Sequence, residues 1–486
     1  MKVESYFGTK YWFDNNLGIV YPLDPILEKK VSTNPDNRIA CIDNQNDDAF
    51  DAQFMKKIEK IKRSIIRIQQ KELTPNEIKR QILQDGLLQI TMSITEACNL
   101  ACRYCYYSDI YTYSRKPSTK KMDFQTAKKA LDYYASLIKE GERFNPLRTP
   151  TIGFYGGEPL LNFDLIKKCV SYFEKTYPEM DTGFTITTNG TLLDEKKSDY
   201  LMEHNFSIAI SIDGPENEHN RNRIYPDGSG TFSDIIKNIK TIMDAGYKKC
   251  HSLCVFDWKS DLFALQDFFS RDDIPPLALA SMPNIYDGCL YYERFTQEDR
   301  VKYRESEAEA FKWYIEHVRE TGYKGSFFDN IFGLHASKTL FSVPSLINYQ
   351  TYLIPYTGSC LPGRKIYVDV GGKYHICERV NHTFPIGDIE NGLDFNRIAN
   401  LVYDYGTHLD QCPICQVQKL CGLCYCAFGI EGKFRFSSEI CKDPLKNQRI
   451  ALSWAFTLGE IDPMLPGSIS ENYYSWLAEI SPTMGD

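Results

Sequence analysis

The sequence lacks several features that would direct a protein to a membrane or to nucleic acid. No apolar run in its 486 residues reaches the roughly 20 residues that a membrane-spanning helix requires. The first residues, MKVESYFGTKYWFDNN, contain no continuous apolar stretch of the kind found in secretory signal peptides. An excess of positive charge is also missing, since 56 Lys and Arg against 64 Asp and Glu give a net charge of −8. We therefore expect a cytoplasmic protein with no membrane partner and no general affinity for nucleic acid.

Cysteine, in contrast, is abundant, with 16 residues. Disulfides are rare in a reducing cytoplasm, so clustered cysteines indicate metal or redox chemistry. Some cysteines are scattered and are expected to be small buried hydrophobic side chains: Cys41, Cys169, Cys250, Cys254 and Cys289. The others form a triplet near residue 100 and a later group between residues 360 and 441.

Residues 1–85 are predicted to form a separate small unit. The β-prone runs KYWF and GIVYPL flank a turn rich in Asp, Asn and Gly, which is typical of a β-hairpin. Hydrophobic residues then recur at alternating spacings of four and three from Phe54 to Ile68, as expected of an amphipathic helix. A hairpin followed by helices is compatible with a winged-helix-like module.

Residues 86–320 alternate between β-prone and helical segments. The predicted strands are LQITMSI, TIGFY, FTITT, FSIAISI, CHSLCVF and LALASMP. Helical patterns begin near Asp123, Asn162, Asp194, Thr231 and Lys259. This alternation favours an α/β fold in which six βα units build a parallel sheet and a partial or complete barrel. In such barrels the active site lies at the C-terminal ends of the strands.

The rest of the chain is expected to divide into three parts. Residues 321–355 form a bridging region without a clear pattern. Residues 356–445 are rich in loops and contain the later cysteine group, and residues 446–486 read as a helical tail. No internal repeat or low-complexity segment is present.

The cysteine triplet, in the segment EACNLACRYC, directly follows the first predicted barrel strand. Three thiolates on one loop can hold three corners of a 4Fe–4S cluster and leave the fourth iron open. Structural zinc sites need four closed ligands, whereas an open position is typical of catalytic sites. Iron–sulfur clusters also reach potentials low enough to reduce a difficult acceptor. The alternative is a zinc loop that takes its fourth ligand from elsewhere in the chain.

The spacing in CNLACRYC, with an aromatic residue before the last cysteine, resembles the signature of the radical S-adenosylmethionine (radical SAM) superfamily. The resemblance implies that Cys98, Cys102 and Cys105 hold a 4Fe–4S cluster whose open iron is chelated by SAM. Reductive cleavage of SAM then gives a 5′-deoxyadenosyl radical that abstracts a hydrogen atom.

Further motifs follow the next predicted strands. YGGEP is similar to the family's GGE motif at Gly156, Gly157 and Glu158. The glycines let the backbone approach the methionyl part of SAM, and a backbone carbonyl or Glu158 can accept a hydrogen bond from its ammonium group.

The resemblance also implies polar contacts to SAM at the ends of the third and fourth strands, for which Asn189 and Ser211 are the candidates. HNRNR is similar to the HDxxR stretch of the same subfamily and places Arg223 where an arginine pairs with the SAM carboxylate, although Asn220 replaces the usual acid. Tyr104 is a candidate to lie against the adenine. Ordinary loop hydrogen bonding and aromatic packing are the alternatives for these residues.

The second cysteine group resembles the SPASM extension of many peptide-modifying radical SAM enzymes. The first half fits the consensus at Cys360, Gly372 and Cys377, whereas Tyr425 occupies a position where a cysteine is expected. The resemblance implies one closed auxiliary 4Fe–4S cluster, with the ligands Cys412, Cys415, Cys421 and Cys441. A second auxiliary cluster, the third in the protein, would be held by Cys360 and Cys377 together with Cys424, Cys426 or both. If only one of the last two ligates, this cluster keeps an open iron that can bind a substrate thiolate. A zinc domain is the alternative.

The resemblance implies peptide or protein substrates and leaves two main reactions. Anaerobic sulfatase maturases oxidise a cysteine or serine to formylglycine, and they carry an acidic proton acceptor where Glu378 follows Cys377. Other maturases link a cysteine sulfur to a carbon of another residue, as in sactipeptides and ranthipeptides. Many of these carry a winged-helix element that adds the leader peptide as an extra strand.

Residues 1–85 favour the second reaction, because sulfatase maturases begin almost directly with the barrel. CERVNHTFPIGDIENGLDF and CGLCYCAF also resemble maturases of Cys-rich peptides. We therefore predict a thioether-forming maturase of a precursor peptide, reduced by a flavodoxin- or ferredoxin-type protein. Carbon–carbon crosslinking, epimerisation and a non-enzymatic zinc scaffold that presents a peptide-binding winged helix are the other hypotheses.

Overall fold

The structure, a computed structural model, describes the chain in segments. They are residues 1–14, 19–23, 72–112, 116–283, 289–321, 325–342, 359–379, 382–409, 412, 415–418, 420–436 and 438–480. The centre of the fold is a sheet in which six consecutive parallel strands follow chain order. These strands are β4 (Gln89–Thr95), β5 (Thr151–Gly156), β6 (Gly183–Thr188), β7 (Ser207–Ser211), β8 (Cys250–Val255) and β9 (Leu277–Ser281).

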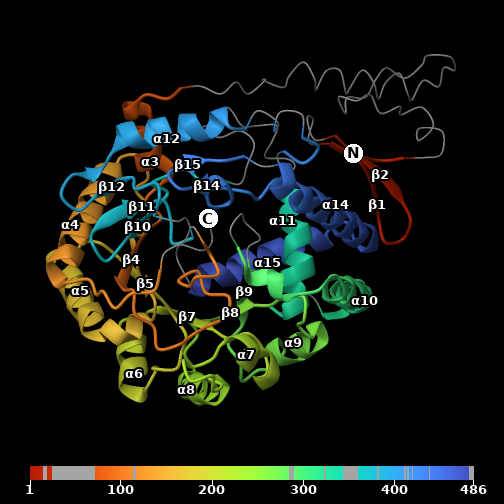
Figure 1. The fold of residues 1–486 in the computed structure, drawn as a ribbon, viewed down its shortest axis with the longest axis horizontal. Helices are drawn as coiled ribbons and strands as arrows, with labels where there is room; N and C mark the ends of the chain where they lie inside the picture. Colours follow the sequence, from red (N-terminus) through yellow and green to blue (C-terminus); the bar gives the residue numbers. More distant parts are fainter. Residues whose placement is uncertain are drawn as a thin grey trace.

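Helices connect these strands and lie outside the curved sheet, as Figure 1 shows for α4, α5, α6 and α8. The connecting helices are α4 (Phe124–Gly141), α5 (Phe163–Thr176), α6 (Glu195–Glu203), α7 (Glu216–Asn222), α8 (Phe232–Asp244) and α9 (Leu262–Phe269), with a 3₁₀ turn η1 (Pro159–Asn162) before α5. Several begin where the sequence predicts because an aspartate caps them. Asp123 and Asp194 each accept a hydrogen bond from the backbone N–H three residues further on. The predicted α/β barrel of βα units is thus confirmed.

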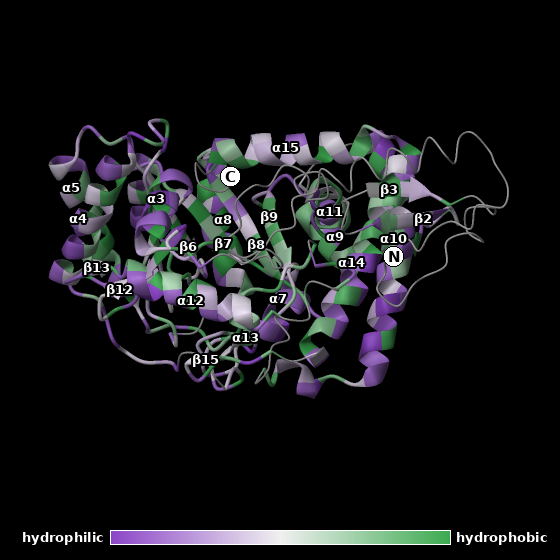
Figure 2. Cartoon of the chain, turned by 90° about the horizontal axis from the view of Figure 1, so that it is seen from above, coloured by the Kyte–Doolittle hydropathy of each residue, from purple (hydrophilic) through white to green (hydrophobic). Residues whose placement is uncertain are grey.

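Strand β4 shows how the layers form. Ile90, Met92 and Ile94 are completely buried, and they alternate with Thr91 and other small polar residues. Because side chains alternate across a strand, one face of β4 packs its apolar residues against the helices and the other carries polar ones. Figure 2 shows the same contrast, with hydrophobic strands such as β9 inside and hydrophilic surface on α5 and α10 outside.

The cysteine-rich region continues the same sheet, which the sequence did not predict. Strand β10 (Lys365–Val368) pairs in parallel with β4, from Lys365 opposite Gln89 to Val368 opposite Met92. Antiparallel strands then extend the edge: β11 (Lys373–His375), β12 (Gly387–Asp388) and β13 (Gly392–Leu393). Since β4 also leads into the cysteine triplet, this pairing places the later cysteines beside the start of the barrel.

The N-terminal segment forms a separate antiparallel sheet of β1 (Lys2–Glu4), β2 (Lys10–Asp14) and β3 (Ile19–Pro22). The predicted hairpin is confirmed, since β2 pairs with β3 from Tyr11 opposite Pro22 to Asp14 opposite Ile19. This sheet packs through Val3 and Phe13 against Leu452 and Phe456 of a C-terminal helix. The amphipathic helix predicted between Phe54 and Ile68 lies outside the described residues, so the winged-helix assignment stays a prediction.

Helix α3 (Pro75–Asp85) begins with a capping box, in which Thr74 and Glu77 satisfy each other's backbone N–H groups. Its buried residues Ile78 and Ile82 belong to the main hydrophobic core together with β4 and α4. The boundary at residue 85 stays a prediction, although α3 packs with the barrel.

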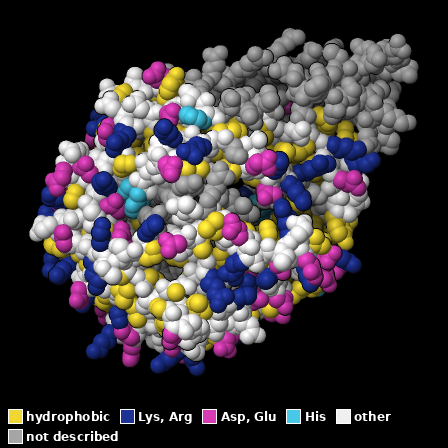
Figure 3. Space-filling model, viewed as in Figure 1, with side chains coloured by type: hydrophobic (Ala, Val, Ile, Leu, Met, Phe, Trp, Pro, Cys, Tyr) yellow, Lys and Arg dark blue, Asp and Glu magenta, His cyan; other side chains and the backbone are white. Residues whose placement is uncertain are grey.

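The remaining elements lie mainly near the two ends of the sheet (Figure 1). They are η2 (Tyr291–Arg294), α10 (Gln297–Thr321), the π-helix η3 (Asp329–Leu334), α11 (His335–Ser342), α12 (Phe395–Thr407), α13 (Tyr425–Phe428), β14 (Gly429–Ile430), β15 (Lys433–Phe434), α14 (Ser438–Ile461) and α15 (Leu465–Ile480). In the described part of the chain, no helix is both long and apolar enough to cross a membrane. Acidic and basic side chains are interspersed over the face seen in Figure 3.

Candidate active site

The cysteine triplet lies on the loop after β4, at the C-terminal end of the parallel strands. Backbone hydrogen bonds fix this loop, because the N–H groups of Ala101 and Arg103 donate to the carbonyls of Ile224 and Asn222 at 2.8 and 2.9 Å. Two sulfurs already accept backbone hydrogen bonds: Cys98 Sγ from Leu100 N and Cys105 Sγ from Tyr107 N, both at 3.4 Å.

The surroundings of the triplet suit metal-bound sulfur. Burial raises the pKa of the Cys98 and Cys102 thiols to about 12, so neither ionises at neutral pH without help. A bound metal deprotonates a coordinating thiol outright, and N–H donors stabilise the resulting thiolate. Three such sulfurs on one fixed loop fit the three protein ligands of an open cluster.

The two glycines of YGGEP pack directly on this loop. The N–H groups of Gly157 and Glu158 donate to the carbonyls of Thr95 and Ala97, each at 2.8 Å. A Cβ atom at Gly156 would lie 2.1 Å from the Thr95 oxygen, and one at Gly157 would lie 2.2 Å from the Ala97 oxygen. Gly156 also has a φ of 144°, which L side chains rarely adopt. The glycines are therefore required for contact with the cluster loop, whether or not they also approach SAM.

Glu158 is fully buried and joins the ends of β5 and β6. Its carboxylate accepts hydrogen bonds from Asn189 N at 2.8 Å, the Thr188 hydroxyl at 2.7 Å and Leu160 N at 3.1 Å. Burial raises the pKa of Glu158 to about 7, although these hydrogen bonds favour the charged form. Its expected contact with the SAM ammonium group stays a prediction, since both of its oxygens already accept hydrogen bonds.

Asn189 lies against the cluster loop. Its side-chain N–H donates to Asn99 Oδ1 at 2.9 Å and lies 3.9 Å from Cys98 Sγ. Ser211 ends β7 and is partly buried. The roles of Asn189 and Ser211 in binding SAM stay predictions.

A buried charge network lies beside the triplet. Arg223 Nε is 3.0 Å from Asp213 Oδ2, and the Tyr104 hydroxyl donates to the same carboxylate. The Arg223 guanidinium lies 5.4 Å from the centre of the Tyr104 ring. Burial alone would lower the pKa of Arg223, but Asp213 outweighs it and the pKa is raised. The expected contacts of Arg223 with the SAM carboxylate and of Tyr104 with the adenine stay predictions.

Asp213, two residues after Ser211 at the end of β7, was not predicted from the sequence. The signal was available, because an acid directly after the fourth strand of a parallel barrel lies at the catalytic end. Asp213 also accepts a hydrogen bond from Val255 N at 3.0 Å, and its own N–H donates to His219 Nδ1 at 3.2 Å. A second missed group is Asp257 after β8, which binds Arg221 Nη1 through both oxygens at 2.6 Å.

The structure brings four later cysteines together into a first auxiliary group. They are Cys360, Cys377, Cys424 and Cys426. The Cys426 side chain hydrogen-bonds with both Cys377 and Cys424. Burial raises the pKa of Cys360, and Cys377 and Cys424 are close enough to raise it further. The hydrogen bond from Cys426 lowers the pKa of Cys424. Tyr425, at the position where a cysteine is expected, is instead buried against the Tyr405 ring at 4.5 Å.

The other four later cysteines are the ones expected to form a second auxiliary group: Cys412, Cys415, Cys421 and Cys441. Cys415 N donates to the Cys412 carbonyl at 3.0 Å. Burial raises the pKa of Cys421 to about 11, with further contributions from Cys415 and Cys441. Cys415, Cys421 and Cys441 therefore lie near one another, whereas the place of Cys412 in this group and the metal that each group holds stay predictions.

Tyr106 connects the triplet loop with the first auxiliary group. It follows Cys105 directly, and burial raises its pKa, with Arg379 acting against this shift and Cys426 and Cys424 adding to it. Arg379 in turn lies beside Glu378, Tyr106 and Tyr155, which together raise its pKa against the effect of burial. Glu378 precedes Arg379 and contributes most to raising the pKa of that arginine, and its role as a proton acceptor stays a prediction.

Comparisons with known proteins agree with this site. Residues 92–257 match the family model of the radical SAM superfamily, and this segment contains the triplet, the glycine pair and the Arg223 network. The chain therefore contains a radical SAM domain.

Its relatives include radical SAM enzymes of several kinds. It is 27% identical to the radical SAM cyclopropyl synthase TigE of Paramaledivibacter caminithermalis over 36% of each chain. It is 30% identical to the cysteine-type anaerobic sulfatase-maturating enzyme of Clostridium novyi, over 30% of this chain and 37% of that enzyme. The chain thus spans less than half the length of the curated relatives it matches. The solved structure of native anSMEcpe with bound AdoMet shows the same fold, with a TM-score of 0.55 and 18% identity over 77% of this chain and 99% of that one.

Proposed function

We propose that this chain is a radical SAM enzyme that forms thioether crosslinks in a ribosomally synthesised precursor peptide. The crosslink would join a cysteine sulfur of the peptide to a carbon atom of another residue. The observation that carries this proposal is the separate sheet β1–β3, which belongs to neither the barrel nor the cysteine-rich region. Among the described strands, β1 and β3 each pair with β2 alone, and an extended leader peptide would add a strand at an edge of this sheet.

The residues that would hold the cofactors are those grouped by the fold. Cys98, Cys102 and Cys105 would bind a 4Fe–4S cluster, and polar groups at the ends of β5 to β7 would bind SAM. When bound, this cluster and SAM would provide the radical that abstracts a hydrogen atom from a substrate carbon. The N–H donors to Cys98 and Cys105 and the glycine pair that holds their loop support this assignment.

The first auxiliary group bears on how the substrate cysteine is handled. Because Cys424 and Cys426 both lie with Cys377, four thiols are available for one cluster. This favours closed coordination and makes direct binding of a substrate thiolate to an auxiliary iron the less supported route. In the proposed arrangement the auxiliary cysteines hold electron acceptors, and Glu378 takes the thiol proton before the carbon–sulfur bond closes.

Formylglycine formation is the second candidate. It is favoured by the likeness to a sulfatase-maturating enzyme and by the position of Glu378 after Cys377. The two reactions change a peptide differently. A thioether removes two hydrogen atoms and blocks one thiol while the sulfur stays, whereas conversion of cysteine to formylglycine removes the sulfur.

The test is an anaerobic reaction of the full chain with SAM, a flavodoxin-type reductant and the peptide encoded by a short Cys-rich reading frame beside the gene. We expect a product that has lost two hydrogen atoms per crosslink and resists thiol alkylation. The matched control is the chain with Cys98, Cys102 and Cys105 changed to Ala. A product without sulfur, or a sulfatase encoded in place of the peptide, would contradict thioether formation and support the second candidate.

A further inference from the structure

A group of metal-binding side chains lies in the cysteine-rich region outside all three cysteine groups. Asp369, directly after β10, occupies a turn whose backbone orients its carboxylate. Its Oδ1 accepts hydrogen bonds from Gly371 N at 2.9 Å and Lys373 N at 3.0 Å. Oδ1 is therefore occupied by the backbone, and Oδ2 faces the other way.

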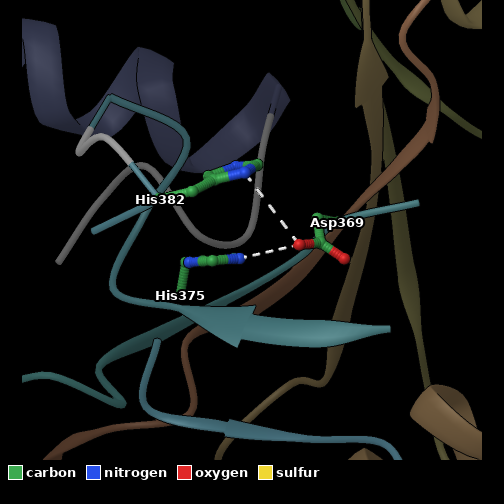
Figure 4. Close-up of side chains that lie close together, drawn as sticks. All are labelled: Asp369, His375 and His382. Carbon is green, nitrogen blue, oxygen red and sulfur yellow. Dashed lines mark hydrogen bonds and ion pairs between the residues drawn. The ribbon is translucent and has the colours of Figure 1, made fainter. Parts of the chain in front are cut away.

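Two imidazoles meet at Oδ2, as Figure 4 shows. His375 Nε2 lies 2.9 Å from this oxygen and His382 Nδ1 lies 3.9 Å from it. The two rings are stacked, with centres 4.0 Å apart and planes inclined by 14°. One carboxylate oxygen and two ring nitrogens thus converge within 4.8 Å of one another.

We propose that Asp369, His375 and His382 form a binding site for a divalent transition-metal ion of the zinc type. Two imidazoles and one carboxylate are a ligand set that zinc prefers, and water completes the fourth position of an open site. In a tetrahedral site with bonds of about 2.1 Å the ligand atoms lie about 3.4 Å apart. The observed separations of 2.9 and 3.9 Å from Oδ2 fall on either side of that value.

The three side chains differ in solvent exposure, and the most exposed of them can reorient to bind an ion. His375 is 1% exposed and Asp369 14%, whereas His382 is 26% exposed. The stacked rings direct their nitrogens in parallel, so ligation requires one ring to tilt, and the partly exposed His382 can do so. Burial would raise the pKa of Asp369, but the hydrogen bonds from His375 and Lys373 N outweigh it and keep the pKa below its ordinary value.

The place of the site indicates its role. His375 precedes Cys377 by two residues and ends β11, while His382 lies after the turn that carries Glu378 and Arg379. An ion bound by all three side chains would close this loop at both ends. It would hold Cys377 in position for the first auxiliary group, while its fourth coordination position stays open to water.

The experiment uses the full chain with its iron–sulfur clusters reconstituted first, so that the cysteines are occupied. Zn²⁺ alone is then added in equilibrium dialysis, and bound zinc and iron are measured by mass spectrometry. We expect one equivalent of zinc, bound about tenfold or more weakly in Asp369→Asn and in His382→Ala. The matched control is His408→Ala, a partly exposed histidine of the same region. It should bind zinc like the wild type.

X-ray absorption at the zinc edge of the wild-type chain decides the matter independently of how the variants fold. Nitrogen and oxygen ligands support the site. Sulfur ligands alone would place the zinc at cysteines and overturn the proposal. Equal zinc binding in all three variants, or no bound zinc in the wild type, would show that the cluster is a hydrogen-bonded triad without a metal.

Discussion

The contact between Gly157 and the cluster loop offers a direct test of how the site is built. A Cβ atom added at Gly157 lies 2.2 Å from the oxygen and 2.5 Å from the carbon of the Ala97 carbonyl. Ordinary van der Waals contact requires the loop to retreat by about 1 Å. No flexible side chain can absorb this overlap, because the obstacle is the backbone one residue before Cys98.

We predict that Gly157→Ala costs about 1–3 kcal/mol of stability through overpacking. It should also weaken the hydrogen bond from Glu158 N to the Ala97 carbonyl, at about 1 kcal/mol. Because the displaced loop carries the triplet, the reconstituted variant should contain about four fewer irons per chain than the wild type. Iron analysis and thermal unfolding under anaerobic conditions measure both effects.

The control is Gly459→Ala in α14, where an added Cβ meets nothing within 4 Å. It should keep all of its iron and unfold at the same or a slightly higher temperature, since alanine favours a helix over glycine. A Gly157→Ala chain with full iron content and an unchanged unfolding temperature would refute the reasoning.

Three other predictions follow from the site. Asp213→Asn breaks a buried ion pair with Arg223 and should cost about 3–5 kcal/mol of stability, measured as a lower unfolding temperature. Glu439→Gln breaks an exposed pair and should change the unfolding temperature little. Equal shifts in the two variants would contradict the burial argument. Burial lowers the pKa of His219 from 6.5 to about 3. Neutral His219 therefore stabilises the fold above pH 6.5, and this contribution is lost as the pH falls from 6.5 towards 3. The unfolding temperature of His219→Gln should fall less steeply with decreasing pH than that of the wild type, and an identical fall would rule the histidine out as a cause. Cys424→Ala and Cys426→Ala should each change the electron paramagnetic resonance spectrum of one reduced cluster if both thiols ligate, and an unchanged spectrum in either variant would assign that cysteine a structural role.

Much of the barrel could be predicted because its signals are local. Each of the six strands is a short β-prone run, and helices such as α4 and α6 begin at an aspartate whose side chain satisfies the first turn. The cysteine triplet could be predicted as a cluster-binding loop for the same reason, since its three cysteines lie on one loop and their spacing can be read directly from the sequence.

The remainder depends on contacts between distant residues. Strand β10 has only four residues and pairs with β4, whose sequence lies more than 270 positions earlier. A short run such as KIYV carries no sign of this partner. The pairing of Arg223 with Asp213 and the meeting of Cys426 with Cys377 likewise arise from the way separate loops pack. Asp369 and His382 were missed because single histidines and aspartates have no spacing that marks them as ligands.

The sheet extension explains how two cysteine groups far apart in the sequence come to lie near each other. β10 lies beside β4, and the triplet loop leaves β4 while Cys377 follows β11. Tyr106 and Arg379 then lie between the triplet and the first auxiliary group.

The measurement that tests the central claim most directly is the iron, sulfide and zinc content of anaerobically purified chain, with and without Cys98, Cys102 and Cys105 changed to Ala. About 12 irons per chain falling to about 8 in the variant is the predicted result, because one cluster of four would be lost and two would remain. Little iron after reconstitution, with stoichiometric zinc at the cysteines, would contradict the assignment of the triplet and with it the proposed radical chemistry.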